Sequence, residues 1–221
     1  FGLLCKEQNG MSSHAARDFE TWANANSSAS NQKQLLSEVF ISTNEYGRDW
    51  HVTHKAFRGS ICRKAFDAMT GSRLERAEDS YEFLVLASMS NLEVTNTDIR
   101  GYVYNIGRGV TTDNMLSPDK FLMSASQIKS CWEEAKHFAD STESVLVKES
   151  ATRLKERLTF TLMNEWKDRV SDNDKIEAAK SVAPIIGEVE TATALMRFAR
   201  DGAYASIEYL NPSTSAFLDW A

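Results

Sequence analysis

The chain has 221 residues, of which 42% are hydrophobic and 25% charged, with 3 Pro and 10 Gly. This composition excludes a collagen-like, disulfide-knotted or disordered chain, and a chain of this length buries roughly 70% of its unfolded surface without a metal or disulfide. The net charge of −6 argues against uniform coating of a nucleic acid or an anionic membrane, but it leaves room for a local basic surface.

The first half of the chain has apolar residues at three- and four-residue spacing, which is typical of amphipathic helices. Caps and turn residues divide this half into segments, and Gly59 is expected to kink one of them. Five helical segments are predicted: one after Ser13, one after Ser30, one from Trp50 to Gly71, one between Ser72 and Ser90, and a short one from Thr97 to Ile106.

The second half continues the helical pattern with longer segments. Pro118 follows a capping serine and opens a helix whose apolar face is predicted to consist of Ile128, Cys131, Trp132, Ala135, Phe138 and Ala139. The longest helix is expected from Glu143 to about Val170, and another begins near Asp174. Pro184 is expected in the first turn of a last helix, which Gly202 ends.

Strand alternation and hairpin dipeptides are missing, so the predicted fold class is all-α, a compact bundle of about eight to ten helices. We expect a single domain over 1–221, divisible into lobes at 1–115 and 116–221. The apolar chain ends, at 1–11 and 211–221, are expected to be extended arms that dock on copies of the same chain.

The three cysteines are an odd number at long spacing, Cys5, Cys62 and Cys131. Such spacing forms neither a disulfide framework nor a zinc motif, and it favours a reducing, intracellular setting. Cys62 and Cys131 are expected to be small buried hydrophobic residues. No stretch approaches the roughly 20 apolar residues of a membrane-spanning helix, so we expect no membrane partner.

A basic segment stands out between Arg48 and Arg76. It holds seven basic and three acidic residues, a local charge of +4, whereas the remainder of the chain carries −10. Aromatic residues lie among these charges, and single-stranded nucleic acids are bound by this combination of cations and rings. The alternative is a solvated helix face with ion pairs along it. The candidate RNA-binding residues are Arg48, Lys55, Arg58, Arg63, Lys64, Asp67, Arg73 and Arg76.

Within this segment, the string Arg63-Lys64-Ala65-Phe66-Asp67 resembles the Arg-x-Ala-Phe-Asp string of coat proteins of flexible filamentous plant viruses. The resemblance covers five residues, which lie in the first third of this chain and not in the last third. It implies an all-helical protein in which Arg63 faces an RNA phosphate and Asp67 pairs with a neighbouring arginine.

Two histidine patterns suggest metal chemistry but are incomplete. His51-x-x-His54 with Cys62 lacks a fourth ligand at a suitable spacing for zinc. Glu134-x-x-His137 matches half of a di-iron carboxylate site, and no second copy of the motif is present. We therefore interpret the latter as a surface pair, and we expect no catalytic residue, metal site or cofactor.

Together these observations predict a non-enzymatic helical assembly protein that binds single-stranded RNA through its backbone phosphates. It would be of the viral coat protein or nucleoprotein type, located in the host cytoplasm and the virion if viral. A helical protein–protein adaptor without nucleic acid remains the main alternative. A helical enzyme with a pocket built from distant residues is the second.

Overall fold

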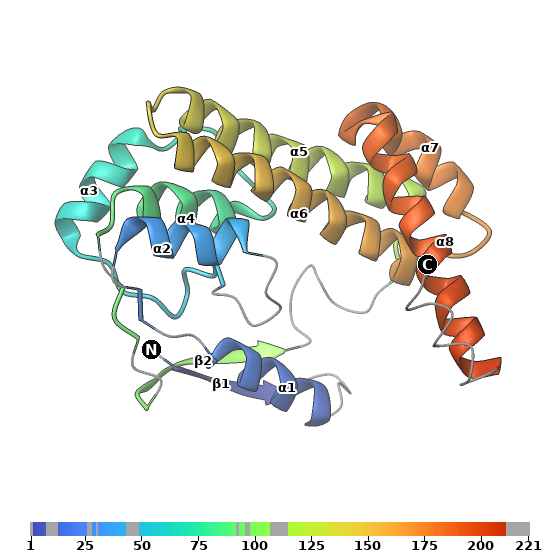
Figure 1. Ribbon diagram of the computed structural model, residues 1–221, viewed down its shortest axis with the longest axis horizontal. Coiled ribbons are helices and arrows are strands. Elements are labelled where there is room, and N and C mark those ends of the chain that lie inside the picture. Colours follow the sequence, from blue (N-terminus) through green and yellow to red (C-terminus); the bar gives the residue numbers. More distant parts are fainter. Residues whose placement is uncertain are drawn as a thin grey trace. The chain divides into compact units, whose positions relative to one another are not determined.

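The computed structural model describes residues 2–7, 13–25, 28–29, 31–42, 49–91, 93–95, 98–106 and 115–210. The all-α prediction is confirmed, because eight α-helices dominate these residues and the only strands among them form one small sheet (Figure 1). The elements are β1 (Gly2–Glu7), α1 (Ser13–Ala23), α2 (Gln32–Leu36), the π-helical η1 (Ser37–Ile41), α3 (Gly59–Ala68), α4 (Glu78–Ser88), β2 (Arg100–Ile106), α5 (Pro118–Asp140), α6 (Val145–Arg169), α7 (Lys175–Ile186) and α8 (Glu188–Leu210).

The chain divides into two compact units. Unit 1 comprises residues 1–115 and 126–158, and unit 2 comprises residues 116–125 and 159–221. The helices α5 and α6 therefore contribute one segment to each unit. Unit 1 includes the C-terminal part of α5 and the N-terminal part of α6.

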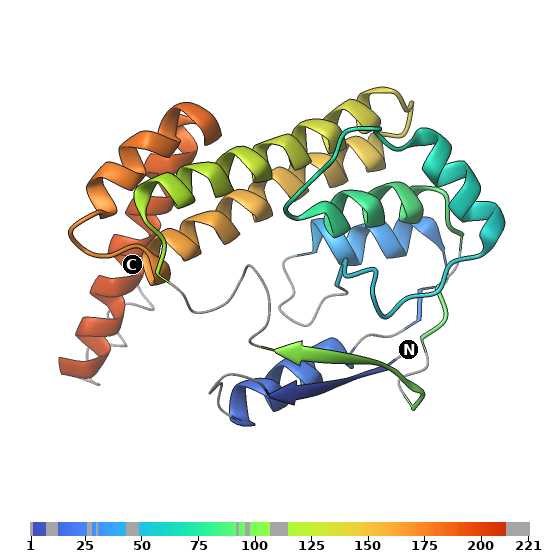
Figure 2. The same cartoon turned by 180° about the vertical axis from the view of Figure 1, so that it is seen from behind.

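The core of unit 1 is built around α4, which lies beside α2 (Figure 2). Its residues 80, 81 and 83–87 are all buried, so this helix is covered on most of its sides. Phe83 lies at its centre, with ring centroids 6.3 Å from Phe40 and 6.4 Å from Phe57. Each fully buried side chain of this size contributes about 1.5–3 kcal/mol through removal from water.

The predicted apolar face of α5 is confirmed. Ile128, Cys131, Trp132, Ala135, Phe138 and Ala139 are all buried. The facing part of α6 buries Val147, Ala151, Leu154 and Leu158. Arg157 of α6 places its guanidinium 4.1 Å from the ring centroid of Trp50 and donates a hydrogen bond to the Val39 carbonyl. This stacking joins the segment before α3 to the helices of unit 1.

The sheet consists of β1 and β2 in parallel, with Leu3 opposite Tyr102 and Cys5 opposite Tyr104. The prediction of a helix from Thr97 to Ile106 is therefore wrong, because residues 100–106 form strand β2. Aromatic and β-branched residues alternate in β2, and the Tyr104 ring stacks on Phe19 of α1 with centroids 5.2 Å apart. Residues 2–7 of the arm expected at 1–11 are paired within the chain, and the arm expected at 211–221 lies outside the described residues.

Other helix boundaries also differ from the prediction, and α4 begins at Glu78 and not near Ser72. Residues 49–58 form turns and extended backbone, and the helix begins at Gly59 and not at Trp50. Pro184 lies in the last turn of α7, and α8 starts after Gly187, whose φ of 114° suits only glycine. Gly202 does not end α8, which continues to Leu210.

Unit 2 is held together by an aromatic group on α6 and α8. The Phe198 ring lies 6.1 Å from Phe160 and 6.3 Å from Trp166, measured between ring centroids. The Trp166 indole N–H donates to the Lys175 carbonyl at 2.8 Å, which fixes the start of α7. None of the helices in the described part of the chain has the length and apolar character needed to cross a membrane.

Candidate nucleic-acid interface

The helix α3 is weakly embedded in unit 1. Of its ten residues, Ala65 is the only one that is buried, and Ile61 and Cys62 are half-buried. The helical period places these three residues on one side. The remaining sides, including the predicted site residues Arg63 and Lys64, face solvent.

Cations and an aromatic ring share the exposed surface of α3. Phe66 is 71% exposed, and it follows Arg63 by three residues, which places the two side chains on neighbouring positions of the helix. Asp67 follows Arg63 by four residues and is also exposed. We call the exposed residues Arg58, Arg63, Lys64, Phe66 and Asp67 the α3 surface.

The backbone at the start of α3 sets the positions of these side chains. Arg58 is extended and caps the helix, and its carbonyl accepts hydrogen bonds from the N–H groups of Ile61 and Cys62 at 2.9 and 3.0 Å. The Arg63 guanidinium lies over Gly59, because a Cβ at position 59 would be 3.4 Å from its Nη1 atom. Within the described ranges, Arg58, Arg63 and Lys64 form no ion pair.

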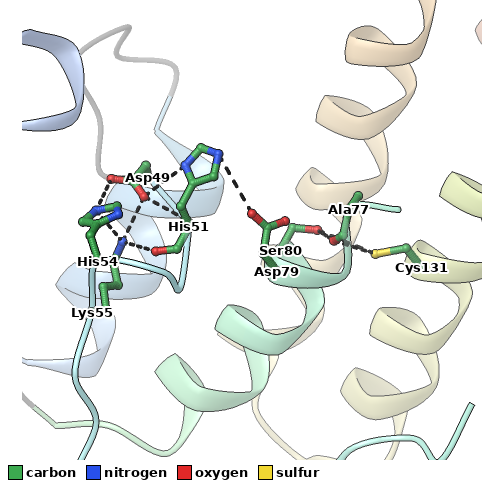
Figure 3. Close-up of polar contacts among 8 residues, drawn as sticks. All are labelled: Asp49, His51, His54, Lys55, Ala77, Asp79, Ser80 and Cys131. Carbon is green, nitrogen blue, oxygen red and sulfur yellow. Dashed lines mark hydrogen bonds and ion pairs between the residues drawn. The ribbon is translucent and has the colours of Figure 1, made fainter. Parts of the chain in front are cut away.

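Lys55, another predicted RNA-binding residue, belongs to a buried polar cluster (Figure 3). Its Nζ atom lies 2.9 Å from an Asp49 carboxylate oxygen, and His51 and His54 each approach that carboxylate at 3.3 Å. Burial alone would raise the pKa of Asp49, but the hydrogen bonds from the two histidines and the charge of Lys55 hold it well below its usual range. In this structure the Lys55 charge is therefore neutralised internally.

The cluster connects the segment before α3 to two helices. The His51 ring is 3.9 Å from the Asp79 carboxylate of α4, and its edge contacts Phe19 and Trp22 of α1 at centroid distances of 6.4 and 6.1 Å. Burial raises the pKa of Asp79, while the neighbouring His51 opposes that shift. The contacts around Asp49 explain why residues 49–55 form turns here.

Cys131 of α5 is a buried thiol that contacts the residues at the start of α4. Cys131 Sγ lies 3.1 Å from the carbonyl of Ala77 and 3.6 Å from the hydroxyl of Ser80, which itself donates to the same carbonyl at 2.6 Å (Figure 3). Burial raises the pKa of Cys131 to about 11, so the group stays a thiol at neutral pH. Cys131 is buried as predicted, whereas Cys62 is half-buried. These contacts are suited to packing and not to nucleophilic chemistry.

The structure separates the predicted RNA-binding residues into groups. Arg58, Arg63, Lys64 and Asp67 come together on the α3 surface, and Lys55 does not join them. Arg73 is exposed with its Nε 3.5 Å from Glu75, Arg76 is half-buried, and Arg48 lies outside the described residues. The two histidines of the suggested zinc pattern face Asp49, and no group of three or more metal-ligating side chains occurs in the described part of the chain.

A pocket that sequence reasoning missed lies directly after α3. Its volume is about 640 Å³, and its polar lining includes Thr70, Tyr81, Glu133, Glu134 and His137. Glu134 and His137 are the two residues interpreted above as a surface pair. In the sequence, the spacing of Glu134 and His137 indicates only that these two residues share one face of a helix. The other polar lining residues, Thr70 and Tyr81, are more than fifty residues earlier in the chain, so their proximity could not be predicted.

Comparison with known protein families, with curated proteins and with solved structures finds no match to this chain. The class that the fold defines is an all-α protein with a small parallel sheet. The α3 surface and the pocket beside it are the features of unit 1 from which a function can be inferred.

Proposed function

We propose that this protein is a non-enzymatic helical assembly protein that binds single-stranded RNA along the α3 surface, as a viral coat protein or nucleoprotein does. The observation that carries the proposal is the exposure of Phe66 beside Arg63 on a helix that buries only Ala65. A helix of this kind gains little from packing, so its exposed ring and charges are available for a ligand.

Each component of the α3 surface matches a part of a single strand. The guanidinium groups of Arg58 and Arg63 and the ammonium of Lys64 suit phosphate oxygens. The ring of Phe66 offers a platform for an unstacked base, an interaction worth about 1–3 kcal/mol per base. A duplex keeps its bases stacked inside, so the combination favours a single strand.

Asp67 has a different part in the proposal. Its position four residues after Arg63 allows its carboxylate to orient that guanidinium or an arginine of a neighbouring copy. The resemblance to filamentous coat proteins implies such a pairing. Replacement of Asp67 by Ala should then weaken RNA binding although it removes a negative charge.

Assembly is the second part of the proposal, with copies of the same chain as partners. Leu4 of β1 and Val103 of β2 are directly opposite each other, and both are exposed. An exposed apolar pair on a two-stranded sheet favours coverage by another subunit. The arm expected at 211–221 is the other predicted docking segment. Its deletion should leave a folded protein that no longer assembles, as measured by analytical ultracentrifugation with RNA present.

The proposal is tested by fluorescence anisotropy with labelled single-stranded RNAs of unrelated sequence. Phe66→Ala should weaken binding about tenfold, because a stacking platform is lost. Val145→Ala on α6 is the matched control, since Val145 is also an exposed apolar residue in unit 1. Thermal melting should show little change for either variant. Unaltered RNA affinity in Phe66→Ala would argue for the adaptor alternative.

A further inference from the structure

The pocket after α3 combines a size suited to a small ligand with unused hydrogen-bonding groups. Its volume of about 640 Å³ lies within the range of small-molecule sites. One wall is formed by Ala68 at the end of α3 and the two residues after it, a second by Tyr81 of α4, and the third by the C-terminal part of α5 and Ser141. All three walls belong to unit 1.

Tyr81 offers the pocket a hydroxyl group that can donate a hydrogen bond to a ligand. The residue is only 3% exposed, and its phenolic oxygen accepts a hydrogen bond from the Thr70 N–H at 2.8 Å. The hydroxyl hydrogen has no acceptor in the described parts of the chain. Burial, together with the charge of Glu134, raises the pKa of Tyr81, so the hydroxyl keeps its hydrogen at neutral pH. A donor that lines a pocket in this way is available to a ligand that brings an acceptor.

The acceptors of the polar lining that carry a negative charge lie on α5. Glu133 and Glu134 contribute two carboxylates, and Lys129 approaches only the first of them, at 3.7 Å. Phe138 and His137 add ring surfaces on the same wall. The complementary ligand is therefore flat, and one of its edges carries two N–H donors beside a single acceptor.

We propose that this pocket binds a guanine base of the RNA strand that the α3 surface holds, a proposal that rests on the function inferred above. The Watson–Crick edge of guanine carries two N–H donors for the carboxylate of Glu134, which Lys129 does not approach, and one carbonyl oxygen for the Tyr81 hydroxyl. Uracil offers one donor between two acceptors, and adenine and cytosine offer a single amino group. Splayed bases of single-stranded RNA are read in this way, by edge hydrogen bonds and by stacking on rings.

The location of the pocket agrees with this assignment. Its lining begins at Ala68, the last residue of α3, which is one helical turn beyond Lys64. A strand whose phosphates lie along the α3 surface can therefore place a base in the pocket. The carboxylates would repel a phosphate, so the base and not the backbone is the part that enters.

The test uses free nucleosides, which lack the phosphates that the α3 surface needs. Guanosine, inosine and uridine are titrated into the full chain and followed by NMR chemical shifts. Inosine differs from guanosine only by the missing amino group, so it should bind about tenfold more weakly, and uridine should bind more weakly still. Glu134→Gln should abolish the difference between guanosine and inosine. Glu149→Gln, an exposed glutamate on α6, should preserve it.

A second variant and an oligonucleotide separate the two proposals. Tyr81→Phe should weaken guanosine about tenfold, and hydrogen exchange verifies that α4 stays folded. Equal affinity for guanosine and inosine, or no binding of either, overturns the guanine pocket. A uridine-only RNA that binds the wild type and loses affinity in Arg63→Gln supports the α3 surface in either case. If that RNA fails to bind while guanosine binds, the RNA-binding proposal is overturned.

Discussion

The ammonium group of Lys55 lies 2.9 Å from the carboxylate of Asp49, and the two side chains are 11% and 2% exposed. This pair turns the chain between η1 and α3 and removes one cation of the basic segment from solvent. The ion pair is therefore a structural element that prepares the α3 surface. Its contribution to stability can be measured separately from RNA binding.

We expect Asp49→Asn to lower the free energy of unfolding by roughly 3 kcal/mol, because the Lys55 charge would stay buried without its counterion. Urea denaturation followed by circular dichroism measures the change. Asp140→Asn is the control, since Asp140 pairs with Lys136 on the exposed side of α5 and its loss should have little effect. Equal effects of the two substitutions would contradict the structural role of Asp49.

The low pKa of Asp49 also predicts how stability depends on pH. A carboxyl with a folded-state pKa below its unfolded value stabilises the protein above the unfolded value, near 3.8, and this stabilisation is lost as the pH falls further. Below pH 3.8 the wild type should therefore lose up to about 1.4 kcal/mol per pH unit more than Asp49→Asn. Urea midpoints measured from pH 5 to pH 2 give both slopes, and parallel slopes would refute the prediction.

The three cysteines should differ in their rate of alkylation. Burial raises the pKa of both Cys131 and Cys5 to about 11, and the nearby Glu20 adds to the shift at Cys5. Thiolates react and thiols do not, so Cys5 and Cys131 should be modified slowly by iodoacetamide at pH 8. Cys62 lies on α3, which buries only Ala65, and we expect it to be modified first. Peptide mass spectrometry against time measures the order. In urea all three should react at similar rates, and early native modification of Cys131 would disprove its burial.

The helices with a clear apolar stripe could be predicted from sequence, because their burial follows from spacing alone. The face from Ile128 to Ala139 on α5 is an example, and all six of its apolar residues are buried. The segment from Trp50 to Arg58 also has helical spacing, but its conformation depends on the buried Asp49 carboxylate. Likewise β2 forms because it pairs with β1, almost one hundred residues earlier.

The residues of the candidate site could likewise be predicted only in part, because their surroundings depend on contacts between distant segments. The excess of cations between Arg48 and Arg76 is visible in the sequence, but Lys55 and Arg63 look alike there. Only the fold shows that one is paired with Asp49 and that the other faces solvent. The pocket after α3 joins residues from three separate segments, so no local motif indicates it.

The salt dependence of RNA binding tests the central claim most directly. In the triple variant Arg58→Gln, Arg63→Gln, Lys64→Gln, each lost phosphate contact should flatten the log–log dependence of affinity on salt by roughly 0.7. The loss should be similar for unrelated RNA sequences, since phosphates carry no base information. Arg153→Gln, an exposed arginine on α6, should leave the slope unchanged. A triple variant with the wild-type slope and affinity, or a wild type without salt-dependent binding, would contradict RNA binding at the α3 surface.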